Sequence, residues 1–172
     1  MRRRHTLAAT LAALGLAAGL GLAAAPEAEL ATGIDIAAPP ETVWALLADP
    51  AAHVAWNPMV LAMEGDLATG ARFRMTLATG ATGSVTFRPE VVHHSPGREL
   101  CWLGRLGAPR LLDGLHCWRI EANATGTRLT NAESFRGVLL WAMDAQTFRD
   151  GFEAANLGLK AAAEARAEAE RG

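Results

Sequence analysis

Three polar residues with the chemistry of an acid–base or anchoring site fall on strand-like segments near the end of the chain. In residues 115–122 and 127–135, apolar side chains alternate with polar ones, which is typical of half-buried strands. This alternation places His116 on the apolar face of the first segment and Asn131 and Glu133 on that of the second. Burying a carboxylate is costly unless it is paired. We therefore expect His116 to pair with Glu133, with Asn131 as a neutral donor beside them.

Three roles are open to this group. It can be an acid–base pair, with His116 and Glu133 as the candidate catalytic residues. It can be a polar anchor inside an apolar pocket, or a structural cluster that fixes strand register. His93 could share the face and complete a metal site, but no close ligand spacing supports that alternative. We expect no metal and no cofactor.

Large apolar side chains could form a cavity wall around these polar groups. Strand parity or proximity to the last helix selects Phe73, Met75, Phe87, Trp102, Trp118, Phe135, Trp141 and Phe152. Trp141 precedes that helix and could form the mouth. Tryptophan brings a large apolar area with one N–H group, and methionine adapts to irregular spaces. Filling a solid core is the alternative for all of them.

The two cysteines, Cys101 and Cys117, lie at equal distances from a turn near residue 109. An ungapped hairpin would set them opposite each other, within reach of a disulfide. In an oxidising compartment they would form that bond. The alternative is two thiols packed as small apolar groups.

These candidate residues need a scaffold that brings the strands around a closing helix. Residues 147–170 carry an apolar stripe on Phe148, Phe152, Ala155, Leu159 and Ala162, which predicts a helix that must bury one face. Upstream, two short helices follow a first strand at 31–37. Strand-like segments then run at 60–64, 72–79, 84–94, 99–106, 115–122 and 127–135. Short turns between strands indicate an antiparallel, curved sheet, so the predicted class is α+β.

The first 25 residues differ from the remainder. Three arginines precede a run of Leu, Ala, Gly and Thr that ends in three alanines, which is the order of an export signal. The apolar run of about 19 residues is also long enough for an uncleaved membrane anchor, and a mis-assigned start is the third alternative. We thus divide the chain into a signal or anchor at 1–25, a linker at 26–33 and a domain at 34–170. A real signal would place the domain in the periplasm or outside the cell; otherwise it is cytoplasmic.

Composition excludes several function classes. The chain has 172 residues, 51% of them hydrophobic, and a formal net charge of −2, so no basic footprint for nucleic acid exists. The sequence has no glycine-rich phosphate loop and no Gly-x-Ser-x-Gly elbow. Any membrane contact would come through the N-terminal segment. The partner that remains is a small hydrophobic molecule.

Five stretches, in this order, resemble the helix-grip superfamily of START-like, SRPBCC or polyketide cyclase/dehydrase-type domains. They are IAAPPETVWALLADP at 36–50, WNP at 56–58, GLHCW at 114–118, TRLTNAESFRG at 127–137 and GFEAAN at 151–156. The resemblance covers about residues 34–165. It implies a seven-stranded antiparallel sheet wrapped around the C-terminal helix, with two small helices at one end. It supplies no universal catalytic residues.

Members of this superfamily bind lipids, sterols, polyketides or aromatic metabolites, and a minority catalyse cyclisation or dehydration. The first hypothesis for this chain is accordingly binding of a small hydrophobic or amphipathic molecule. The second is a cyclase or dehydratase, a lyase or isomerase in which His116 and Glu133 carry protons. The third is a stress-response or interaction module whose interior is filled by side chains.

Overall fold

The computed structural model describes residues 25–172. The export signal or anchor expected at 1–25 therefore falls, except for Ala25, outside the described residues. The chain forms eight strands and three α-helices over that range, which confirms the predicted α+β class. Among the described helices, none is both long enough and apolar enough to cross a membrane.

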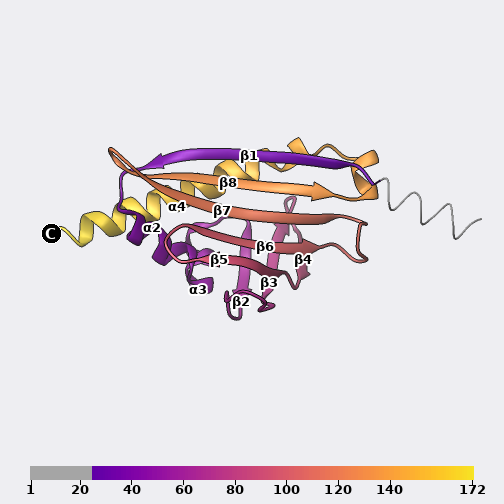
Figure 1. Ribbon diagram of the computed structural model, residues 1–172, viewed down its shortest axis with the longest axis horizontal. Helices are drawn as coiled ribbons and strands as arrows, with labels where there is room; N and C mark the ends of the chain where they lie inside the picture. Colours follow the sequence, from indigo (N-terminus) through magenta and orange to yellow (C-terminus); the bar gives the residue numbers. More distant parts are fainter. Residues whose placement is uncertain (1–24) are drawn as a thin grey trace, which may run out of the picture.

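A sheet of five long antiparallel strands forms the base of the fold (Figure 1). Its order is β1 (Glu27–Ile36), β8 (Gly126–Arg136), β7 (Asp113–Asn123), β6 (Glu99–Arg105) and β5 (Glu90–Ser95). A second sheet of β2 (Val60–Glu64), β3 (Arg74–Thr79) and β4 (Gly83–Phe87) runs steeply across the first. Two short helices, α2 (Pro40–Leu47) and α3 (Pro50–Trp56), follow β1 as expected.

The two sheets are joined where a single strand was expected. The segment 84–94 is divided by Pro89 into β4 and β5, because proline has no N–H for the ladder and fits only at a bend or an edge. Main-chain bonds bridge the bend: Val91 N–H donates to Ala71 O at 2.9 Å, and Phe73 N–H donates to Pro89 O at 3.2 Å. If β4 and β5 are counted as one bent strand, the expected seven strands are recovered.

The expected linker at 26–33 is wrong, because β1 begins at Glu27 and pairs with β8 along its whole length. The register joins Glu27 to Arg136 and Ile36 to Thr127. The segment reads as a linker in isolation because glutamate, alanine and glycine favour strands weakly. Pairing with a long central strand overrides that local preference.

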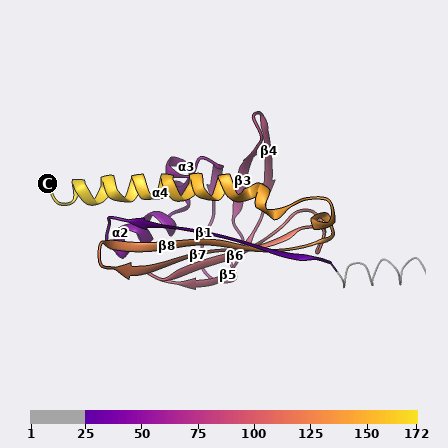
Figure 2. The ribbon, with the colours of Figure 1, turned by 90° about the horizontal axis from the view of Figure 1, so that it is seen from above.

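The closing helix α4 (Arg149–Ala169) lies across the concave side of the sheet, as Figure 2 shows. Two 3-10 turns, η1 (Val138–Trp141) and η2 (Ala145–Phe148), lead into it. Leu159 and Ala163 are fully buried in the main core. Gly158 permits close approach to α3, since a Cβ atom there would lie 1.9 Å from the carbonyl oxygen of Trp56. The helix therefore packs tightly on α3 at this point.

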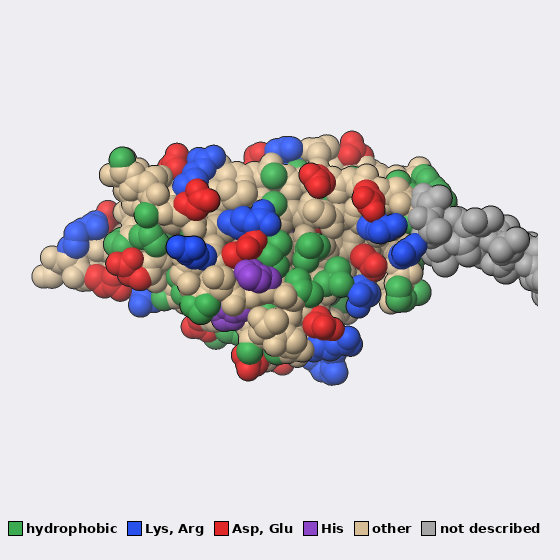
Figure 3. All heavy atoms as spheres, viewed as in Figure 1, with side chains coloured by type: hydrophobic (Ala, Val, Ile, Leu, Met, Phe, Trp, Pro, Cys, Tyr) green, Lys and Arg blue, Asp and Glu red, His purple; other side chains and the backbone are tan. Residues whose placement is uncertain are grey.

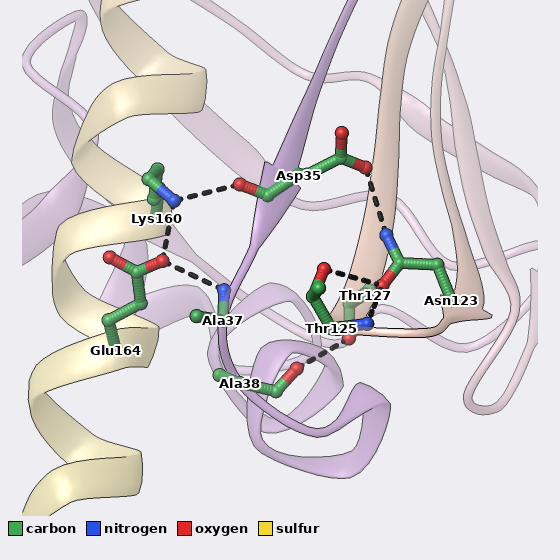
Figure 4. Close-up of polar contacts among 8 residues, drawn as sticks. All are labelled: Asp35, Ala37, Ala38, Asn123, Thr125, Thr127, Lys160 and Glu164. Carbon is green, nitrogen blue, oxygen red and sulfur yellow. Dashed lines mark hydrogen bonds and ion pairs between the residues drawn. The ribbon is translucent and has the colours of Figure 1, made fainter.

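Polar contacts fasten the C-terminal half of α4 to the end of β1 (Figure 4). Lys160 Nζ donates to the main-chain oxygen of Asp35 at 2.8 Å, and Glu164 accepts from the Ala37 N–H at 2.8 Å. Lys160 and Glu164 also pair with each other at 2.5 Å. The hydrogen bond from Lys160, followed by that from Ala37, lowers the pKa of Glu164. These contacts fix where the helix lies along the strand.

The turn between β7 and β8 is tied to the same place. Asn123 Nδ2 donates to the Asp35 carboxylate at 2.9 Å, and Thr127 Oγ1 donates to Ala38 O at 2.8 Å. Thr127 is fully buried, so its hydroxyl needs this acceptor. One end of the fold is thus closed by paired polar groups, while the other end carries η1 and η2.

Candidate functional site

A cavity of about 480 Å³ lies between the concave side of the sheets and the N-terminal half of α4. This volume is in the range of small-molecule sites. Its walls are predominantly apolar and come from α3, both sheets, η1, η2 and the first turns of α4.

Nine of the eleven residues expected at a binding site line this cavity. They are Met75, Phe87, Trp102, His116, Trp118, Asn131, Glu133, Phe135 and Phe152. Phe73 is wrongly placed by the sequence analysis: it is 1% exposed and packs edge-on against Trp102, so it fills the core beside the cavity. Trp141 is also outside the wall. It is 65% exposed on η1, between Leu139 and Met143, which do line the cavity.

The polar part of the wall follows the strand register. His116 on β7 lies opposite Glu133 on β8 and opposite Trp102 on β6. Two residues further along β7, on the same face, Trp118 lies opposite Asn131. Directly opposed positions bring side chains into contact. Two neighbouring rows of the sheet therefore present a histidine, a carboxylate, two indoles and an amide to one space.

His116 and Glu133 form the expected pair, with Nδ1 of the imidazole 3.3 Å from Oε2 of the carboxylate. Only 13% and 17% of their side-chain areas are exposed. Trp102 stacks on the imidazole, with ring centres 4.9 Å apart and planes inclined by 6°. Trp118 and Phe152 approach it at 5.1 Å and 5.2 Å. Three aromatic rings thus hold the imidazole in one orientation.

Gly114 makes room for the carboxylate of this pair. A Cβ atom at this position would lie 2.0 Å from Oε1 of Glu133. Any side chain at 114 would therefore push the carboxylate away from its place in the cavity wall.

Asn131 does not act as the third member of the pair, which corrects the expectation from sequence. Its amide nitrogen donates to α4 instead, to Asn156 Oδ1 at 3.1 Å and to the Phe152 carbonyl at 3.4 Å. Asn156 in turn donates to Thr32 Oγ1 on β1 at 2.8 Å. Asn131 and Asn156 are 0% and 3% exposed, so this chain is a buried polar link between helix and sheet.

His53 lines the cavity, although the sequence analysis did not select it. It is 1% exposed, and its Nε2 lies 2.8 Å from the Leu47 carbonyl oxygen. A carbonyl only accepts, so Nε2 carries the proton of the neutral ring. Burial lowers the pKa of His53 to about 4; the Leu47 bond opposes this and nearby His116 adds to it. The signal that was missed is the three-residue spacing to Trp56, which puts both rings on one helical face, 4.5 Å apart.

The opposite face of the same strands carries the cysteines. Cys101 and Cys117 are opposed in the register, and their sulfur atoms are bonded at 2.12 Å. His93 lies on this outer face, 54% exposed and 3.5 Å from Glu99, so it cannot join His116 in the alternative metal site. Figure 3 views this face, where basic and acidic side chains surround a few hydrophobic ones.

One group of metal-ligating residues occurs in the described part of the chain: Glu99, Cys101 and Cys117. Its two sulfur atoms are already joined to each other. A thiolate is needed to bind a metal, so this group does not fit one as it stands.

Comparison with models of known protein families identifies the family of this chain. The model described as "Polyketide cyclase / dehydrase and lipid transport" matches residues 27–164. The chain belongs to this family. The family assignment agrees with the helix-grip resemblance that the motifs indicate. A comparison with curated proteins finds no match.

Solved structures share the family's fold. Protein CV1439 from Chromobacterium violaceum is 21% identical, with a TM-score of 0.67 over 79% of this chain and 96% of that one. An AHSA1-like protein from Aeromonas hydrophila is 17% identical, with a TM-score of 0.63 over 81% and 94%.

A third structure is the di-domain ARO/CYC StfQ from the steffimycin biosynthetic pathway. It is 16% identical, with a TM-score of 0.65 over 85% of this chain and 52% of that chain. At these identities the likeness establishes the helix-grip fold alone.

Proposed function

We propose that the protein binds a small hydrophobic or amphipathic molecule in the cavity between the sheets and α4. The observation that carries this proposal is the cavity itself, about 480 Å³ with mostly apolar walls and a few polar groups gathered on β7 and β8. Apolar walls supply affinity, and a few placed polar groups supply orientation. Such a void counts against a module whose interior is filled by side chains.

Native mass spectrometry of freshly purified protein tests the proposal, because a co-purified ligand would appear as added mass. Val85→Trp should reduce ligand occupancy, since Val85 on β4 lines the cavity and an indole would fill part of it. Leu61→Trp is the matched control, because Leu61 lies on β2 of the same sheet and is 52% exposed. Equal occupancy in the two variants would count against the cavity as the binding site.

A second candidate function is acid–base catalysis of the cyclase or dehydratase kind. The observation that favours it is the half-enclosed His116–Glu133 pair, which could move a proton at a bound substrate. The family description and the ARO/CYC structure are consistent with either role.

Glu133→Gln separates the two functions. In a binding protein the change weakens affinity modestly, because one charged partner becomes neutral while the shape is kept. In an enzyme it lowers turnover by roughly a hundredfold or more with little change in affinity. Binding and single-turnover measurements on the same ligand distinguish these outcomes.

A further inference from the structure

Three buried polar atoms around the inner part of the cavity have no hydrogen-bond partner in the part of the chain that the structure describes. They are Nε2 of His116, Nε1 of Trp118 and Oδ1 of Asn131. Each belongs to a side chain that lines the cavity. Leaving such atoms unpaired costs free energy, so each invites a partner from a ligand.

The chemistry of two of these atoms is fixed by their type and contacts. The indole Nε1 of Trp118 can only donate. The amide nitrogen of Asn131 must face α4, because the Phe152 carbonyl it contacts can only accept. Its Oδ1 is therefore the unpaired atom and can only accept.

The third atom follows from the His116–Glu133 pair. A carboxylate accepts from Nδ1, so that nitrogen carries the proton. In the neutral form of the ring, Nε2 then offers a lone pair. The three unpaired atoms of the cavity wall are thus one donor and two acceptors.

These requirements discriminate among ligand groups. A carboxylate cannot donate to Asn131, and it would face the carboxylate of Glu133. A ketone satisfies the Trp118 N–H but leaves both acceptors without a proton. A hydroxyl accepts from the indole and donates to one of the acceptors, and two adjacent hydroxyls satisfy all three.

We propose that the ligand carries a hydroxyl group, phenolic, enolic or alcoholic, at the end of an apolar body, and that this hydroxyl lies between Trp118, Asn131 and His116. The register supports a common contact, because Trp118 is directly opposite Asn131 and two residues from His116 on the same face. This inference rests on the proposed binding function, and it specifies the class of ligand.

Three fluorescent probes of one shape test it: 2-hydroxyanthracene, 2-methylanthracene and anthracene-2-carboxylate. Binding is measured by quenching of the tryptophans in the cavity wall. We expect the hydroxy compound to bind about tenfold more tightly than the methyl compound, the range that one well-placed hydrogen bond gives. The carboxylate should bind most weakly of the three.

Trp118→Phe keeps an aromatic ring but removes the N–H, and should reduce the preference for hydroxyl over methyl to about threefold or less. His116→Phe removes one acceptor but keeps the stack with Trp102. It should also reduce the preference for the hydroxy probe over the methyl probe. Trp56→Phe is the matched control: its indole donates to Leu46 O at 3.3 Å and is outside the cavity wall. It should leave the preference unchanged even if it lowers stability.

The outcomes separate the two proposals. Equal affinities of the wild-type protein for the hydroxy and methyl probes would overturn the hydroxyl inference and leave the binding function standing. Failure of all three probes to bind would overturn both. If Trp118→Phe does not fold, the hydroxyl inference is still tested by the affinities of the three probes for the wild-type protein and by His116→Phe.

Discussion

The two halves of α4 differ in what lies beneath them. Under the C-terminal half, Leu159 and Ala163 are fully buried against α2, α3 and the sheet, and Gly158 lets the backbone touch α3. Under the N-terminal half, Phe152 and Ala155 face the cavity. The same helix thus acts as a packed core element at one end and as a lid over open space at the other. Stability and ligand recognition should therefore respond to mutations at different ends.

The largest expected effect lies in the packed half. Leu159→Ala should lower the free energy of unfolding by about 2–5 kcal/mol, because it removes a fully buried side chain and leaves a void that the rigid surroundings cannot fill. Chemical denaturation of the two proteins measures this. A loss below about 1 kcal/mol would show that the C-terminal half is loosely packed after all.

His53 lies where the packed and open halves meet, and it makes stability depend on pH. Burial keeps its folded pKa at about 4, below the value near 6.5 of the unfolded chain. Between these values the unfolded chain binds the proton more readily. The free energy of unfolding therefore has its full value, as far as His53 is concerned, above pH 6.5. It decreases as the pH falls towards 4, by about 3 kcal/mol in total.

Denaturation curves between pH 4 and 7 measure this loss. His53→Gln should flatten the pH dependence, since its amide can still donate to the Leu47 carbonyl and does not titrate. An equally steep curve in the variant would assign the pH dependence to other groups.

The Cys101–Cys117 bond lies on the outer face, away from both halves of the helix. Reducing this bond in the purified protein should lower stability by about 3 kcal/mol, the loop-closure value for a separation of 16 residues. Affinity for a cavity probe should stay unchanged. Melting and probe titration with and without reductant check both points, and a change in affinity would show that the outer face and the cavity are coupled.

Phe152→Ala, in the open half, should cost only about 1–2 kcal/mol, because this ring is partly buried and borders existing space. The same change should weaken ligand binding, since the ring lines the cavity and contacts the imidazole of His116 at 5.2 Å. A loss of stability as large as that of Leu159→Ala would remove the distinction between the two halves.

How far the sequence predicts this arrangement depends on the range of the interactions. Strand parity correctly puts His116 and Glu133 on one face, and equal distances from a turn correctly oppose Cys101 to Cys117. Alternation and an ungapped hairpin are local features of the backbone. They cannot predict that Asn131 bonds to Asn156, since that contact depends on how α4 is placed across the sheet.

The omission of His53 and the wrong placement of Phe73 have the same origin as the error at Asn131, because all three depend on tertiary packing. His53 packs against Trp56 and Trp102, and Phe73 packs edge-on against Trp102, so both positions depend on tertiary contacts. Whether a given inward side chain meets a void or another side chain is decided by three-dimensional packing density, which alternation does not encode. The family resemblance supplied the overall fold but none of these local contacts.

The smallest effect on stability is expected at Trp141 on η1. This side chain is 65% exposed and outside the cavity wall, so Trp141→Ala should change the free energy of unfolding by no more than about 0.5 kcal/mol. Its neighbours Leu139 and Met143 line the cavity, so we expect an entering ligand to pass the indole. A side chain touched during passage but not in the bound state changes the association and dissociation rates by the same factor. Stopped-flow binding of 2-hydroxyanthracene should therefore show both rates altered together, with an unchanged Kd; a weakened Kd would instead mean that η1 closes over the ligand and that Trp141 joins the wall in the bound state.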